Sequence, residues 1–226
     1  LKSIANNWKL DAKFEDNKDY FFYNREIKQI VEHNKYYVIG RKGIGKTSIS
    51  EHLLSLNGPK IFSEKLNFKN FPFNELYEFY NDKFPPPNQY NTIWKYIIYS
   101  SVAKLMVTNE SIDSELRTLL SKIYKPEPIK SLERTVNNWT SAKGGFTILG
   151  TGVTFGITKE SKNKNDSWLQ RVNDLEDIIN KYCDDSTYYI IFDELDEDYR
   201  NMNNDEIGQY KNLLTSLYKA VQNVIV

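Results

Sequence analysis

The sequence has a single cysteine, two histidines and no long apolar run. One cysteine, Cys183, excludes an intrachain disulfide framework and favours a reducing compartment, so we expect the protein in the cytoplasm. Two histidines and one cysteine offer no cluster of the kind that binds zinc. No apolar stretch approaches the length needed to cross a bilayer, so we expect no membrane partner.

Net charge is also absent, because 30 Lys and Arg residues balance 30 Asp and Glu residues. This balance gives no support for a globally basic surface that binds nucleic acid, although a local basic patch is compatible with it. The length of 226 residues predicts one α/β domain, and an aromatic content of 14% is ample for a hydrophobic core.

What the sequence does contain is a glycine-rich phosphate-binding pattern. Residues 36–39 predict a buried strand, and the pattern Gly-x-x-x-x-Gly-Lys-Thr follows directly. Glycines let the backbone curl, so that its N–H groups and the positive end of the next helix form a nest for a triphosphate. We expect Lys46 to neutralise the β- and γ-phosphates and the Thr47 hydroxyl to bind Mg²⁺. The residues expected around the nucleotide are Gly40, Arg41, Lys42, Gly43, Ile44, Gly45, Lys46, Thr47 and Ser48.

Two acidic residues follow a second apolar run. Residues 188–192 predict a central parallel strand that is buried on both faces, and Asp193 and Glu194 come directly after it. Ligands of open α/β sheets collect at the carboxyl ends of strands. We therefore expect Asp193 to hold Mg²⁺, directly or through water, and Glu194 to activate water for attack on the γ-phosphate. Asp196 and Glu197 are interpreted as a solvated helix start.

Hydrophobic periodicity predicts the remaining elements. The stretch 85–158, which lies between the two motifs, predicts a helical and hairpin insertion that serves as a partner-binding face or a lid. The chain begins at Leu1 and ends in residues 223–226, which look like the opening of a buried strand, so we expect the C-terminal part of the core to lie beyond this sequence. Helices are predicted at about 24–33, 46–56, 90–107, 112–124, 167–182 and 206–222, a further helix ending near Trp139, a strand at 60–68, a hairpin at 146–158 and a polar loop at 159–166.

Two segments of the sequence match patterns that bind guanine nucleotides in GTPases. Asn163-Lys164-Asn165-Asp166 matches Asn-Lys-x-Asp, and Asp205-Glu206-Ile207-Gly208 matches Asp-x-x-Gly. The first has no apolar strand before it, and the two occur in the opposite order to that of GTPases. Guanine specificity is therefore disfavoured.

The two motifs together resemble the P-loop ATPases whose catalytic glutamate follows the Walker B aspartate. The chain is most similar to AAA-type and STAND-type signalling ATPases, including bacterial defence and stress ATPases. A third segment, Phe22-Tyr23-Asn24-Arg25-Glu26, resembles the hydrophobic-hydrophobic-Gly-Arg-Glu element that packs near the adenine and ribose, with Asn24 in place of glycine. The resemblance implies a three-layer P-loop NTPase with a central, mostly parallel sheet, and it implies ATP and Mg²⁺ as cofactors. It also places Arg25 near the nucleotide and gives Lys46 and Glu194 catalytic roles.

Two functions from different classes follow. The first is an ATP-hydrolysing switch or assembly module that associates with itself or with a protein partner. The second is a clamp that binds ATP without hydrolysis and presents the stretch 85–158 to a protein or a nucleic acid. A small-molecule kinase is a weaker third reading, because no arginine-rich lid is apparent in the sequence.

Overall fold

The computed structural model describes residues 23, 25–32, 35–56, 58–68, 76–77, 80–122, 124, 144–149, 152–157, 164–195 and 203–224, and for 144–149, 152–157 and 164–168 it describes the backbone alone. These residues form an α/β structure, as predicted. Its elements are α2 (Arg25–Val31), α3 (Lys46–Ser55), β1 (Ile61–Asn67), the short 3-10 helix η2 (Asn88–Tyr90), α5 (Asn91–Thr108), α6 (Ser114–Ser121), β2 (Gly144–Leu149), β3 (Gly152–Ile157), α8 (Lys164–Tyr182), β4 (Thr187–Asp193) and α9 (Asn204–Val224).

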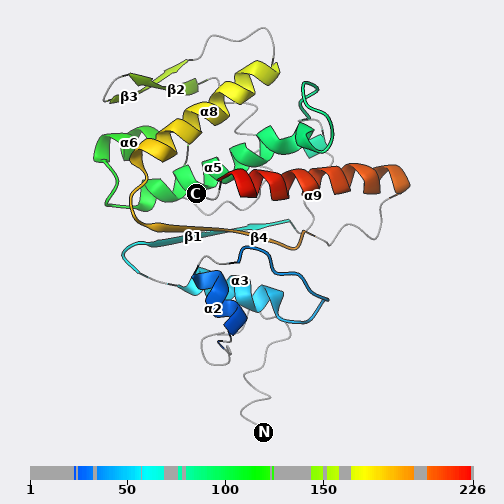
Figure 1. Ribbon diagram of the computed structural model, residues 1–226. Coiled ribbons are helices and arrows are strands. Elements are labelled where there is room, and N and C mark those ends of the chain that lie inside the picture. The colour runs from blue at the N-terminus through cyan, green and yellow to red at the C-terminus, as the bar shows by residue number, and fades with distance from the viewer. Residues whose placement is uncertain are drawn as a thin grey trace.

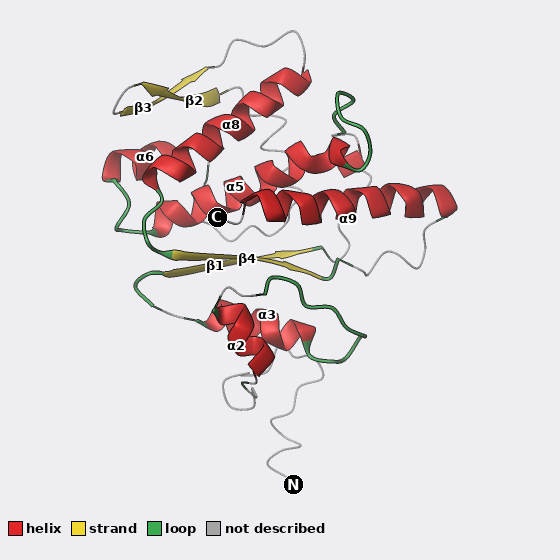
Figure 2. Ribbon diagram, viewed as in Figure 1, coloured by secondary structure: helices red, strands yellow, loops and turns green. Residues whose placement is uncertain are grey.

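A parallel pair of strands lies at the centre, with helices on both of its faces (Figures 1 and 2). β1 and β4 pair in register from Ile61 opposite Thr187 to Asn67 opposite Asp193. On one face lie α2 and α3, and α3 packs against both strands. On the other face lie α5 and α9, with α8 and α6 beyond them. The carboxyl end of β4, which carries Asp193, therefore lies at the edge of a covered sheet.

Alternation along the strands sends successive side chains to opposite faces of the sheet. Ser63 and Lys65 point toward α3, where the Ser63 hydroxyl donates to the Leu53 carbonyl at 3.3 Å. The side chains that alternate with them point toward the opposite face, which α5 covers. On that face the rings of Phe68 and of Phe192 in β4 stack with centroids 5.7 Å apart. The α3 face of the sheet thus places polar side chains beneath the helix that follows the glycine-rich loop.

Helix α5 supplies the centre of the core, although it falls within the stretch 85–158. The Trp94 side chain is fully buried, and its Nε1 donates to the Leu213 carbonyl of α9 at 2.8 Å. Lys104 of α5 is buried against Glu64 of β1, with which it forms an ion pair. The helix is buried around its whole circumference because the sheet, α8 and α9 all pack against it. None of the described helices is long and apolar enough to span a membrane.

Capping residues explain where two of the helices begin. The Asp113 carboxylate accepts from the Leu116 N–H at 2.9 Å and starts α6. At α9, the Asn203 side chain accepts from the Glu206 N–H at 2.9 Å, and the Glu206 carboxylate accepts from the Asn203 N–H at 2.8 Å. This reciprocal pair is a capping box.

The predicted helices and the strand at 60–68 are confirmed to within a few residues, and the predicted hairpin is the antiparallel pair β2 and β3. The predicted polar loop is wrong for residues 164–166, because α8 begins at Lys164. The predicted strand at the end of the chain is wrong for Asn223 and Val224, which belong to α9. The helix expected to end near Trp139, and Asp196 with Glu197, lie outside the described residues.

The prediction of a buried strand at 36–39 is wrong. These residues are exposed, up to 87% for Ile39, and they belong to no ladder. Tyr37 instead contacts α9, where its hydroxyl donates to the Tyr218 carbonyl at 3.4 Å. An apolar run reports β-propensity, but a strand also needs a neighbour that supplies hydrogen bonds, and in the described sheet β4 pairs with β1 alone. For the same reason residues 187–192 of β4 are half-buried rather than buried on both faces.

Candidate functional site

The glycine-rich loop has the backbone conformation that its glycines permit. Gly43 and Gly45 have φ angles of 88° and 92°, in the left-handed region that other residues rarely adopt. Gly45 caps the first turn of α3, which begins at Lys46. A Cβ atom at Gly40 would lie 1.8 Å from Cδ1 of Ile44, so the loop closes on itself where glycine leaves room. Residues 40–44 are exposed, and the loop is open to a ligand.

Lys46 bends back across this loop. Its Nζ donates to the carbonyl oxygens of Gly40 at 2.9 Å and of Arg41 at 3.2 Å. Both acceptors are neutral, and an anionic oxygen would add the attraction of opposite charges to the hydrogen bond. A phosphate at the loop would therefore compete well for the Lys46 ammonium. The exposed side chains of Arg41 and Lys42 add two further cations beside it.

Asp193 is joined directly to the helix that follows the loop. Its Oδ2 accepts from the hydroxyl of Ser50 at 3.0 Å, and both side chains are buried. The Ser50 hydroxyl also lies 2.8 Å from the Thr47 carbonyl oxygen. Ser50 thus links Asp193 to the backbone of Thr47, the other predicted metal ligand, and no hydrogen bond joins the Thr47 and Asp193 side chains in the described set.

A lysine that sequence reasoning missed completes the cluster. Lys65 Nζ lies 3.1 Å from Asp193 Oδ2 and 2.6 Å from Glu51 Oε1. Burial alone would lower the pKa of Lys65, but the hydrogen bonds to Glu51 and Asp193 raise it above its ordinary value. The ammonium therefore stays charged and neutralises the Asp193 carboxylate. No motif in the sequence marks Lys65, because its position depends on the register between β1 and β4.

Glu194 has an uncommon backbone conformation and one carboxylate oxygen without a hydrogen-bond donor. Its φ angle is 60°, in the left-handed region, and its N–H donates to Asp193 Oδ1 at 2.9 Å. Its Oε2 is buried and accepts no hydrogen bond from the rest of the described structure. An ionised oxygen without a donor is costly, and a bound water or ligand would satisfy it. Such strain and lack of satisfaction are common at functional sites.

Arg25, which was predicted to lie near the nucleotide, stands apart from the glycine-rich loop. It is exposed at the start of α2, and no hydrogen bond or ion pair joins it to residues 40–48. The segment around it does approach α3, because the rings of Tyr23 and His52 meet edge to face with centroids 5.8 Å apart. α2 is held to the sheet by the Tyr189 hydroxyl, which donates to the Val31 carbonyl at 3.2 Å.

The residues present fit a nucleotide with a hard divalent cation. Mg²⁺ in nucleotide sites uses one or two carboxylates together with substrate phosphates and water. Asp193 would supply that carboxylate in place of its ion pair with Lys65, and the unsatisfied Glu194 oxygen lies on the next residue. Within the described chain no group of three or more His, Cys, Asp or Glu side chains could hold a metal without such help.

The described residues of the two segments that match guanine-binding patterns lie in helices. Residues 164–166 form the start of α8, and Asp205, Glu206 and Gly208 lie in the first turns of α9. Comparison with protein-family models, curated proteins and solved structures finds no match to this chain.

Proposed function

We propose that this chain is a cytoplasmic, Mg²⁺-dependent P-loop ATPase that acts as a nucleotide-dependent switch or assembly module. One observation carries the proposal: the helix that starts at the glycine-rich loop is hydrogen-bonded to an aspartate at the carboxyl end of a parallel strand, through Ser50 and Asp193 at 3.0 Å. That arrangement supports the proposal, because it joins the helix after the glycine-rich loop to the edge of the sheet where ligands bind in α/β proteins.

The proposed roles follow from the chemistry of each group. The loop N–H groups and Lys46 bind the phosphates, because both present positive charge to an anion. Thr47 and Asp193 hold the cation, whose charge stabilises the transferring phosphoryl group. Glu194 orients the attacking water and accepts its proton, a role for which its unsatisfied oxygen is available.

The assembly part has its own support. Ile39, directly before the loop, and Ile44, within it, are 87% and 58% exposed, and apolar side chains of this size at a site rim suit a protein contact. A neighbouring subunit at that rim would complete the site, as arginine fingers do in trans. Turnover per molecule should then rise with protein concentration, and turnover that is fast and independent of concentration would exclude this part.

A second function, a clamp that binds ATP without hydrolysing it, is favoured by Lys65. Its ammonium lies 3.1 Å from the carboxylate that the metal requires, so the cation must displace a resident charge. A protein that held ATP with Lys65 as its cation would retain the nucleotide and not turn it over.

The test is calorimetric titration of ATP and of GTP, with and without Mg²⁺, combined with phosphate release. We expect selective ATP binding that is lost in Lys46→Ala, and turnover that is lost in Glu194→Gln with binding retained. Lys28→Ala is the matched control, because Lys28 is an exposed lysine of α2, away from the loop, that pairs with Glu32 at 3.5 Å. Binding without turnover in the wild type supports the clamp, and equal binding by wild type and Lys46→Ala refutes both functions.

A further inference from the structure

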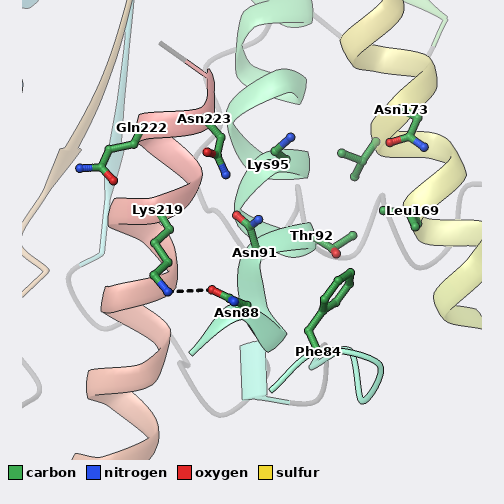
Figure 3. A pocket seen from close by; sticks show the side chains of 11 residues that line it. Phe84, Asn88, Asn91, Thr92, Lys95, Leu169, Asn173, Lys219, Gln222 and Asn223 are labelled. Carbon is green, nitrogen blue, oxygen red and sulfur yellow. Dashed lines mark hydrogen bonds between the residues drawn. The ribbon is translucent and has the colours of Figure 1, made fainter. Parts of the chain in front are cut away.

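A cleft lies on the face of the sheet opposite α3. α5 and η2 form its floor, α8 and α9 form its walls, and the Phe84 ring closes one end (Figure 3). Its volume is about 330 Å³, at the small end of the range of roughly 300–1,000 Å³ for ligand pockets. The cleft therefore suits a single small molecule, and it is separated from the glycine-rich loop by the sheet (Figure 1).

The charge of the cleft is positive. Lys95 and Lys219 line it from α5 and α9, and no Asp or Glu is among its lining residues. Lys219 Nζ donates to the neutral Asn88 amide at 2.9 Å, which holds it over the floor (Figure 3). Lys95 forms an ion pair with Glu176, whose two carboxylate oxygens both lie 3.5 Å from its Nζ. The Lys219 ammonium, which donates to a neutral amide, gives the cleft its positive charge, and that charge favours an anion.

The polar lining is dominated by side-chain amides. An amide presents a donor next to an acceptor, which matches the edge of a nucleobase such as adenine. Asn91 Oδ1 is buried and has no partner within the described structure, so the floor contains an amide whose bonding is incomplete. The amides of the lining are Asn88, Asn91, Asn173, Gln222 and Asn223.

Apolar side chains complete the lining. Phe84, which closes one end of the cleft, is 40% exposed, and Leu169 and Val172 of α8 add apolar atoms to the wall. An exposed aromatic face is a stacking platform for a planar ring. The cleft thus combines a flat apolar wall, an amide floor and two cations.

We propose that this cleft binds a nucleoside monophosphate, with the base against Phe84, the base edge on the amides, and the phosphate between Lys95 and Lys219. The inference does not depend on nucleotide binding at the glycine-rich loop. It gives the chain a second nucleotide site of a different kind, one that takes a single phosphate and contains no glycine-rich loop.

The experiment is calorimetric titration of adenosine 5′-monophosphate into Lys46→Ala, so that the loop contributes nothing. Adenosine and inorganic phosphate are titrated separately. Lys95→Met, Lys219→Met and Phe84→Leu are then tested in the same background, with Lys211→Met as the matched control, because Lys211 is an exposed lysine of α9 outside the cleft. Thermal unfolding of each variant verifies that it is folded.

We expect binding with one site per chain, weakened about tenfold by each cleft substitution and unchanged by Lys211→Met. Adenosine and phosphate alone should each bind more weakly than the monophosphate. No binding of the monophosphate to Lys46→Ala would overturn the proposal. Equal affinities for Lys219→Met and Lys211→Met, or phosphate binding as tight as the monophosphate, would also overturn it.

Discussion

Replacement of Lys65 by methionine tests whether burial makes the Asp193 ion pair important for stability. The Lys65 and Asp193 side chains are only 15% and 10% exposed, and Glu51 is 26% exposed. Removal of one member of a buried pair costs about 3–5 kcal/mol, because the other charge remains in a poor solvent. Asp193 keeps the Ser50 hydroxyl and the Glu194 N–H, and Glu51 can turn to water. We therefore expect Lys65→Met to lower the free energy of unfolding by about 2–3 kcal/mol.

The assay is urea denaturation followed by tryptophan fluorescence in buffer without Mg²⁺, with the slope of the transition used to verify that the same surface unfolds. Lys60→Met is the matched control. Lys60 approaches Asp185 at 2.6 Å, as close as Lys65 approaches Glu51, but its side chain is 53% exposed and that of Asp185 is 77% exposed. Solvent screens such a pair, so its loss should hardly change the unfolding midpoint.

The double variant Lys65→Met with Asp193→Asn separates charge from packing. Neutralising Asp193 should recover part of the lost stability, because the uncompensated carboxylate is then gone. Two results would refute the reasoning: equal losses in Lys65→Met and Lys60→Met, or strictly additive losses in the double variant.

Three further predictions concern the backbone, the pH dependence and the core. Gly45→Ala should lower the free energy of unfolding by about 1–2 kcal/mol, because φ is 92° at Gly45. Gly208→Ala in α9, which has open space around it, should raise that free energy by about 0.5–1 kcal/mol. Equal effects of the two substitutions in urea denaturation would contradict this. Burial, and then the nearby charge of Tyr90, raises the pKa of Tyr77 to about 12 from 10.0, so the unfolded state ionises first. Stability should be fully present below pH 10 and fall as the pH rises to about 12, and Tyr77→Phe should weaken that fall in urea midpoints measured across this window. Trp94→Phe should cost about 1–3 kcal/mol, since it leaves the Leu213 carbonyl without the indole N–H at 2.8 Å and opens a gap in the core; a smaller loss in denaturant would show that α9 repacks.

Much of the secondary structure could be predicted because it is encoded locally. The apolar spacing of α5 and α9, and the Asp113 cap of α6, lie within a few residues of the elements they specify. The conformation of the glycine-rich loop could be predicted as well, because the left-handed φ angles at Gly43 and Gly45 are ones that glycine adopts readily.

The predictions that were wrong or incomplete concern residues whose surroundings are set by partners distant in the sequence. The run 36–39 has strand propensity, yet no described strand pairs with it, and its side chains are exposed. Lys65 reaches Asp193 only because Leu66 lies opposite Phe192 in the parallel register. No local pattern reports that register, so the ammonium on the predicted metal ligand was not foreseen.

The parallel register also has a kinetic consequence. Ile61 pairs with Thr187, and more than half of the chain lies between them, so the sheet forms only after a long loop has closed. α5, α8 and α9 belong to that intervening stretch or follow it closely, and their packing shortens the effective loop before the strands meet. We expect the amides of β1 and β4 to acquire protection from hydrogen exchange last during refolding. The end of β4, which carries Asp193, would then be among the last described parts of the protein to fold. Simultaneous protection of the α5 and β4 amides would argue against this order.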